Sequence, residues 1–260
     1  MEKPSGSAGR SSGPIIQLDS LTKTFDGYHA VNNVSLEVKR GEIFGFVGLN
    51  GAGKSTTIHM MLSLLKPSSG SVYLLGKKVT LGSYGLWEKV GFLEQASYYP
   101  ALTVEENLDI ARRMQKLSGK QCVAEIIQKL GLVPHKNKKA KHLSLGNKQR
   151  LGLAKAMIHN PEILILDEPI NGLDPAGVAE IRDMLLDLSK NHGVTVFLSS
   201  HLLEELAKLA DTIGIIHEGR LIQNIEMATL ERSLKKEMKM VTESLEGYFL
   251  RTIQSTGGTN

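Results

Sequence analysis

The stretch GLNGAGKST, residues 48–56, restricts the fold of this chain more than any other part of the sequence. It fits the pattern G-x-x-x-x-G-K-[ST], in which a glycine-rich loop surrounds phosphate groups. Gly48, Gly51 and Gly53 allow backbone angles that turn successive N–H groups inward. An apolar strand, EIFGFV, precedes the loop, and an amphipathic helix follows it. This context favours a phosphate site over an ordinary glycine-rich turn, because the helix N-terminus would face the same anion.

Two side chains of the loop carry the expected chemistry. Lys54 supplies a point charge to the outer phosphates, and the Ser55 hydroxyl can bind Mg²⁺. The helix after the loop is predicted from an apolar face at helical spacing, formed by Ile58, Met61, Leu62 and Leu65. Proline and glycine in KPSSG, residues 66–70, end that helix.

A second chemical feature is the acidic end of an apolar run, ILILDEP. The run is typical of a buried parallel strand. Asp167 and Glu168 follow it, and adjacent side chains of an extended chain point to opposite sides. We therefore expect two roles: Asp167 holds Mg²⁺, and Glu168 orients or deprotonates an attacking water. A chance acidic strand end is the alternative, which the upstream glycine loop disfavours.

The remaining patterns alternate between strands and helices. Strands are predicted in PIIQLDSLTKTF, in VNNVSLEVKRGEIFGFVG (two strands joined at residues 39–41), in SVYLLGKKV, in GVTVFLSSH and in DTIGIIHEG. Residues 103–130 are predicted to be helical, with a capping box between Thr103 and Glu106. Another helix would bury a face made by Val178, Ile181, Leu185 and Leu188. This order predicts an α/β fold with a mostly parallel sheet covered on both faces.

Composition limits the class of protein further. The chain has 260 residues and a formal net charge of +4, so an anionic partner is permitted but not required. Its single cysteine, Cys122, excludes an intrachain disulfide and is predicted to fill a small buried apolar position. We find no apolar run long enough for a transmembrane helix and no signal peptide, so we expect a soluble cytoplasmic protein. Residues 1–14 are predicted to be a flexible tail and 236–260 a short C-terminal tail.

The stretch LSLGNKQRLGLAKAM, which runs into the acidic strand, indicates a family. It resembles the signature segment of ABC ATPases, the nucleotide-binding domains of ABC transporters. The resemblance covers residues 14–222 and rests on several motifs in one order: the glycine loop, the signature, the acidic strand end, NGLDP and His201 in FLSSHLLEEL. It implies a P-loop NTPase (RecA-like) core over residues 15–235, with an antiparallel β edge region and a helical subdomain at about 97–160.

The resemblance also implies ligands and roles. ATP and Mg²⁺ are the expected cofactors. Phe25 resembles the aromatic residue that stacks on adenine, and Tyr28 is a second candidate for this role. For both residues, ordinary core packing is the other interpretation. His201 would hydrogen-bond the γ-phosphate, and Lys54 and Glu168 would complete the catalytic set. The ATP-binding loop would comprise Gly48, Asn50, Gly51, Ala52, Gly53, Lys54, Ser55 and Thr56.

The signature is implied to act on the ATP of a second subunit. Ser144 and Gly146 would contact that γ-phosphate through a helix N-terminus. Asp174 would cross the dimer interface. The familiar Leu-Ser-Gly-Gly-Gln is altered here, because Leu145 and Asn147 occupy the third and fifth positions.

The loop GFLEQASYYPALTV is a second departure from the family pattern. A glutamine that touches Mg²⁺ is expected there, and the position corresponds to Glu94 or Gln95, depending on the direction of counting. We favour Glu94, because a glutamate here, together with LSLG-KQRLG, resembles the branch of exporter ATPases for bacitracin and lantibiotic resistance. Tyr98 and Tyr99 mark the predicted contact with a membrane subunit, with packing against the helical insert as the alternative.

These features predict an ATP-hydrolysing subunit of an ABC exporter at the cytoplasmic face of the membrane. Two copies, or one copy and a different ATPase subunit, would close around two ATP molecules and drive a separate integral membrane permease. A soluble ABC ATPase acting on ribosomes or nucleic acid is the alternative, and the basic run PHKNKKAKH would suit phosphates. The single domain disfavours it, so no nucleic-acid partner is expected. A regulator that barely hydrolyses ATP is a third possibility, which Glu168 disfavours.

Overall fold

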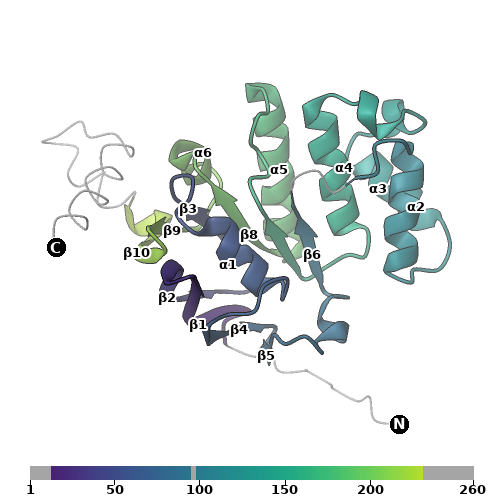
Figure 1. Ribbon diagram of the computed structural model, residues 1–260. Coiled ribbons are helices and arrows are strands. Elements are labelled where there is room, and N and C mark those ends of the chain that lie inside the picture. Colours follow the sequence, from purple (N-terminus) through teal and green to yellow (C-terminus); the bar gives the residue numbers. More distant parts are fainter. Residues whose placement is uncertain (1–12, 95–97, 231–260) are drawn as a thin grey trace, which may run out of the picture.

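The computed structural model describes residues 13–94 and 98–230. Figure 1 shows two sheets with helices packed around the larger one. The antiparallel sheet has the order β2-β1-β4-β5 and contains β1 (Ile16–Phe25), β2 (Tyr28–Val38), β4 (Ser69–Leu74) and β5 (Lys77–Lys78). The six-stranded sheet has the order β10-β9-β3-β8-β7-β6 and contains β3 (Ile43–Val47), β6 (Val90–Leu93), β7 (Ile163–Leu166), β8 (Thr195–Ser200), β9 (Thr212–His217) and β10 (Arg220–Glu226).

Six α-helices are assigned in the described residues: α1 (Lys54–Met61), α2 (Val104–Met114), α3 (Gln121–Lys129), α4 (Leu145–Met157), α5 (Pro175–His192) and α6 (Leu203–Ala207). Within the larger sheet, β9, β3, β8, β7 and β6 run parallel, and only β10 is antiparallel. The predicted α/β class, with a mostly parallel core and a separate antiparallel region, is confirmed.

The central strands are buried on both faces. Alternate residues of β3 enter two different cores: Ile43 packs with the helices on one side, whereas Phe44 and Phe46 pack with α1 and the antiparallel sheet. The ring of Phe197 on β8 stacks on Phe44 at a centroid distance of 5.5 Å. Such two-sided burial explains why these strands are continuously apolar in the sequence instead of alternating.

Helix α1 is shorter than its apolar pattern predicts. It ends at Met61, and Ser63 adopts a positive φ of 58°. The N–H groups of Leu64 and Leu65 both donate to the carbonyl of His59, at 2.9 and 3.1 Å, which closes the helix with a tight turn. Leu65 therefore packs against the core from the turn instead of from the helix, before the proline and glycine of KPSSG are reached.

The stretch SVYLLGKKV is a hairpin and not the single strand that was predicted. Strands β4 and β5 are joined at Leu75 and Gly76, with φ angles of 53° and 72°. Two consecutive positive φ angles are the requirement of a type I′ hairpin turn, which a glycine at the second position favours. The turn was not predicted because its first position is a leucine, Leu75, and not the Asn, Asp or Gly typical of such turns.

The predicted helical stretches are confirmed as two helices, α2 and α3, which residues 115–120 separate. Thr103 caps α2 in the predicted capping box: its hydroxyl accepts from the Glu106 N–H at 3.2 Å, and the Glu106 carboxylate accepts from the Thr103 N–H at 2.7 Å. Helices α2, α3 and α4 share one apolar core, which Cys122 borders as a partly buried residue. An ion pair between Arg150 and Glu180 joins α4 to α5. The boundaries of this insert as a subdomain stay a prediction.

None of the helices in the described ranges has the length and apolar content to span a membrane. The predicted tails fall almost entirely outside those ranges, since residues 1–12 and 231–260 are not described.

Candidate functional site

A cavity of about 660 Å³ opens where the glycine loop meets the carboxyl ends of the parallel strands. Ligands of open α/β sheets bind at this edge. The lining residues are Ala30, Asn50, Gly51, Gly53, Lys54, Ser55, Thr56, His59, Glu94, Asp167, Glu168, Asn171 and His201. Most residues expected from the glycine loop, the acidic strand end and the histidine motif are therefore brought together.

The glycines of the loop are required for two different reasons. Gly51 and Gly53 have positive φ angles of 82° and 105°, as the loop pattern predicts. Gly48 does not share this conformation, and its N–H donates to the carbonyl oxygen of Ser200 at 3.3 Å instead of turning inward, so the prediction was wrong for it. A side chain at Gly48 would collide with the carbonyl oxygen of Ile216 on β9. Gly48 and Ala52 are buried and do not line the cavity.

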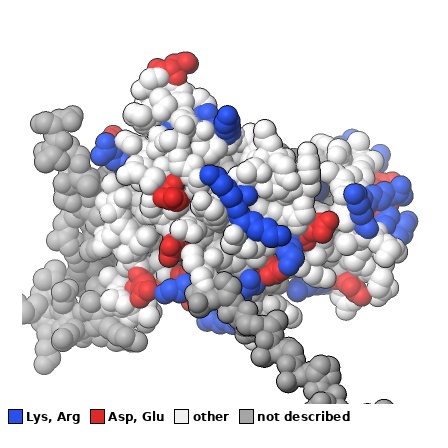
Figure 2. Space-filling model, turned by 90° about the horizontal axis from the view of Figure 1, so that it is seen from below, with Lys and Arg blue, Asp and Glu red and all other residues white. Residues whose placement is uncertain are grey.

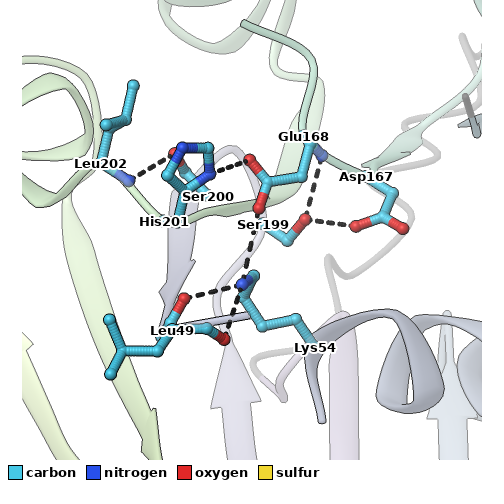
Figure 3. A network of polar contacts seen from close by, with 9 residues as sticks. Leu49, Lys54, Asp167, Glu168, Ser199, Ser200, His201 and Leu202 are labelled. Atoms are coloured by element: carbon cyan, nitrogen blue, oxygen red, sulfur yellow. Dashed lines mark hydrogen bonds and ion pairs between the residues drawn. The ribbon is translucent and has the colours of Figure 1, made fainter. Parts of the chain in front are cut away.

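Lys54 is buried, with 6% of its surface exposed. Its ammonium group donates to the carbonyl oxygens of Gly48 and Leu49, at 2.7 and 3.2 Å, and lies 3.5 Å from Glu168 Oε1 (Figure 3). A buried ammonium group needs such partners. The contacts aim the charge across the cavity, in the position predicted for binding phosphate.

Asp167 and Glu168 are not the successive residues of a regular extended strand that the pattern predicted. Strand β7 ends at Leu166, and Glu168 adopts a positive φ of 50°, so both side chains line the same cavity. Ser199 on β8 fixes the pair: its hydroxyl accepts from the Glu168 N–H at 3.0 Å and donates to Asp167 Oδ1 at 2.5 Å. The left-handed turn at Glu168 therefore replaces the strand geometry that the pattern suggested.

Glu168 lies between two cationic or polar partners in Figure 3. His201 Nδ1 is 2.9 Å from Glu168 Oε2, and Lys54 lies on the other oxygen of the same carboxylate. Glu168 is only 9% exposed. The three side chains predicted to be catalytic thus form one connected group, contributed by the glycine loop and by the ends of β7 and β8.

Of the two residues predicted for the Mg²⁺-contacting position, Glu94 and Gln95, the structure describes only Glu94. Glu94 follows β6, lines the cavity and contacts His59 at 3.0 Å. Gln95 lies outside the described residues. Sequence reasoning missed His59, Asn171 and Ser199; the signal for His59 was its position four residues after Ser55, on the same face of the helix.

Phe25 lies at the end of β1, opposite Tyr28 across the β1–β2 turn. It is 45% exposed, and the ammonium group of Lys23 lies 4.9 Å from its ring centroid. Neither aromatic residue lines the cavity, whereas Ala30 of the same hairpin does. Adenine stacking on Phe25 or Tyr28 therefore stays a prediction.

The signature residues lie outside this cavity, on an exposed edge. Ser144 caps α4 by accepting from the N–H of Asn147 at 3.3 Å, and Asp174 caps α5 by accepting from the N–H of Gly177 at 2.9 Å. Leu145 is 51% exposed and packs toward Gly172. Two capped helix N-termini thus lie beside each other at the surface. That of α4, which a neutral hydroxyl caps, can face an anion from outside the chain, whereas the Asp174 carboxylate already occupies that of α5.

The oxygen donors of the cavity fit Mg²⁺ bound together with a nucleotide. Ser55, Glu94, Asp167 and Glu168 contribute hydroxyl and carboxylate oxygens to one wall, and Mg²⁺ prefers such ligands. Within the described ranges, no group of three or more acidic, histidine or cysteine side chains could hold a metal alone. This agrees with the usual arrangement, in which phosphates and water supply the remaining ligands.

Known proteins resemble this chain in sequence. The family model described as "ABC transporter" matches residues 31–171. The "Uncharacterized ABC transporter ATP-binding protein YcbN" of Bacillus subtilis is 44% identical over 88% of this chain and 75% of its own length. The "Bacitracin transport ATP-binding protein BcrA" of Bacillus licheniformis is 40% identical over 86% of this chain and 74% of its own length.

Solved structures resemble it as well. CbiO1 of Clostridium perfringens, described as part of the ABC transporter complex cbiONQ, has a TM-score of 0.76 and 28% identity, and covers 88% of this chain and 96% of its own. A dimeric post-hydrolysis state of the cassette MJ0796, bound to ADP and Pi, has a TM-score of 0.75 and 28% identity. The match covers 82% of this chain and 98% of the cassette. With the site and the fold in agreement, the chain belongs to the ABC transporter family, as an ATP-binding subunit that hydrolyses ATP to power transport.

Proposed function

We propose that Glu168 directs the water that attacks ATP, while Lys54 and His201 hold the phosphate chain. The main support for this proposal is the contact of Glu168 with both Lys54 and His201 at the cavity wall. Phosphoryl transfer to water depends mainly on positioning and charge stabilisation. Mg²⁺, held by Ser55 and Asp167 with Glu94 at the edge, would neutralise charge on the phosphates.

The second half of each site comes from another subunit in this proposal. Ser144 and Gly146 at the start of α4 would contact the γ-phosphate bound in the cavity of the other copy, and Asp174 would lie at the interface. The exposure of both capped helix ends supports this arrangement, and so does the dimeric state of the related cassette MJ0796. Two identical copies, closing head to tail, are the simplest assembly.

The transported cargo is proposed to be a peptide antibiotic, exported for resistance. BcrA is a bacitracin transport protein, and SrtF of Streptococcus pyogenes, 35% identical over 80% of this chain, is a lantibiotic transport protein. A separate membrane permease would hold this subunit at the cytoplasmic face of the membrane. Tyr98 and Tyr99 mark the proposed contact surface: the ammonium groups of Lys148 and Lys155 on α4 lie 5.9 and 5.7 Å from their ring centroids. Tyr98 packs partly against the core of the helices, as the alternative expected, whereas Tyr99 is 47% exposed.

The basic run at residues 134–142 has a structural role in the helical insert. The carbonyls of Lys136 and Lys138 accept from N–H groups at the start of α2, and Lys136 pairs with Glu105 at 3.2 Å. Figure 2 shows blue and red side chains over the visible face; at the end near α2 and α3, several blue ones gather with red ones beside them. The run therefore does not favour the alternative of a nucleic-acid-binding ATPase.

ATP hydrolysis by the purified chain and its Glu168→Gln variant tests the proposal. Removing the carboxylate should lower turnover by about 10²–10⁴-fold, which is the usual contribution of a general base. ATP binding should persist, and the variant should form an ATP-dependent dimer detectable by light scattering. Equal turnover of the two proteins would refute the role of Glu168, and the absence of any ATP-dependent dimer would refute the homodimer.

A further inference from the structure

A histidine that the catalytic scheme does not use lies in the wall of the nucleotide cavity. His59 Nε2 is 3.0 Å from Glu94 Oε1, and both residues line the cavity beside Ser55. The His59 side chain is 35% exposed and that of Glu94 46%. Neither residue is buried, so the contact is not a requirement of core packing.

The contact joins two elements that meet at the metal side of the cavity. His59 lies on α1 four residues after Ser55, so the two side chains share one helix face. Glu94 directly follows Leu93, the last residue of β6. An ionised carboxylate can only accept hydrogen bonds, so the Nε2–H of His59 is the donor. The contact uses one carboxylate oxygen, and the second oxygen of Glu94 retains acceptor capacity.

Holding Glu94 has a predictable benefit for binding a cation. A half-exposed glutamate loses rotamer freedom when it binds a metal, and that lost freedom weakens binding. A hydrogen bond that orients the carboxylate beforehand removes part of this loss. Partners that orient metal ligands in this way change metal affinity by about 10–100-fold when they are removed.

We propose that His59 is a positioning residue that orients the Glu94 carboxylate toward the Mg²⁺–nucleotide complex. The inference rests on the proposed function, because it takes Glu94 to face the metal. His59 itself touches neither metal nor nucleotide in this proposal. Its effect is therefore confined to the part of nucleotide affinity that depends on Mg²⁺.

Fluorescent ADP binding to the full chain, with and without Mg²⁺, tests this proposal without hydrolysis. The His59→Leu variant removes the donor but keeps a good helix former, whereas His59→Gln keeps an N–H donor. We expect His59→Leu to reduce the Mg²⁺-dependent gain in affinity about tenfold and to leave ADP binding without Mg²⁺ unchanged. His59→Gln should recover most of that gain. In a Glu94→Ala background, His59→Leu should cause no further loss.

Three results would overturn the inference: a wild-type Mg²⁺ response in His59→Leu, an equal loss of affinity with and without Mg²⁺, or losses that add in the double variant. The last two would indicate a general structural role of His59. The Lys54→Met variant separates this inference from the proposed function. If Lys54→Met and the wild type bind ADP equally, the cavity is not the nucleotide site and the proposed function itself fails.

Discussion

The nucleotide cavity and the signature edge are built in opposite ways. In the cavity, Lys54, Glu168 and His201 are largely enclosed and contact one another across three elements. At the edge, Ser144 and Asp174 are exposed, and their recorded hydrogen bonds are to the helices that they cap. In one region the side chains contact one another, whereas the other presents capped helix N-termini to the outside.

In the proposed assembly, this difference lets one folded chain contribute one half to each of two active sites. In that assembly, the cavity of one copy would bind the phosphates on one side and leave the other side to the second copy. The signature edge would contact the phosphates bound by the other copy, and not those bound in the cavity of its own chain. Variants of the two regions should therefore differ in function: cavity variants change nucleotide binding by the isolated chain, whereas edge variants leave that binding unchanged and weaken the assembled pair.

The largest expected effect comes from the cavity. Lys54→Met keeps the apolar stem and removes the ammonium group that contacts Gly48, Leu49 and Glu168. Hydrogen bonds to charged groups contribute about 1.5–3 kcal/mol, so ATP affinity should fall roughly 10–150-fold. Titration of a fluorescent ATP analogue measures this in the isolated chain. An unchanged affinity would show that the cavity does not hold the phosphates.

A smaller effect is expected from two matched helix caps. Ser144 caps α4 at the edge, and Thr103 caps α2 away from it. Replacing either residue with alanine should lower the free energy of unfolding by about 1 kcal/mol, as denaturant titration would measure. Only Ser144→Ala should also weaken the ATP-dependent dimer. If Thr103→Ala weakened the dimer equally, the special role of the edge would be lost.

The smallest effect belongs to a residue in neither region. The Nε2–H of His159 donates to the carbonyl oxygen of Val90 at 3.2 Å, and its buried Nδ1 has no partner among the described residues. Burial lowers the pKa of His159, because the charged ring would lose its hydration. In the unfolded chain the pKa of His159 is about 6.5, so the unfolded state binds the proton more readily than the folded state does. The free energy of unfolding therefore falls as the pH drops below about 6.5.

His159→Gln should remove this part of the pH dependence. Denaturant midpoints measured from pH 7.5 to 5.5 should fall more steeply for the wild type than for the variant, while ATP affinity at pH 7.5 stays the same for both. Parallel stability curves would contradict the assigned effect of burial.

The sequence allowed the glycine loop and the capping box to be predicted because each depends on local spacing. The glycine loop needs fixed intervals, and the Thr103–Glu106 box lies within one helical turn. The apolar β7 segment was recognised as a buried strand for a similar reason, since burial on two faces leaves a continuous apolar run.

Features that depend on distant parts of the chain were not predictable in this way. Gly48 is glycine because Ile216, far along the sequence, approaches it. The geometry of Asp167 and Glu168 depends on Ser199 of the neighbouring strand. The pairing of His59 with Glu94 likewise joins residues 35 positions apart. No local pattern contains these contacts.

The central claim, that each active site combines the cavity of one copy with the signature edge of another, is tested most directly by complementation. Gly146→Asp places a negative charge at the edge; a Cβ there would meet only Leu173 Cδ2 within 4 Å, at an ordinary 3.7 Å. Lys54→Met disables the cavity. Each variant alone should be inactive, and a mixture should recover ATP hydrolysis, because the mixed dimer retains one intact site. A mixture no more active than its two components would contradict the composite site.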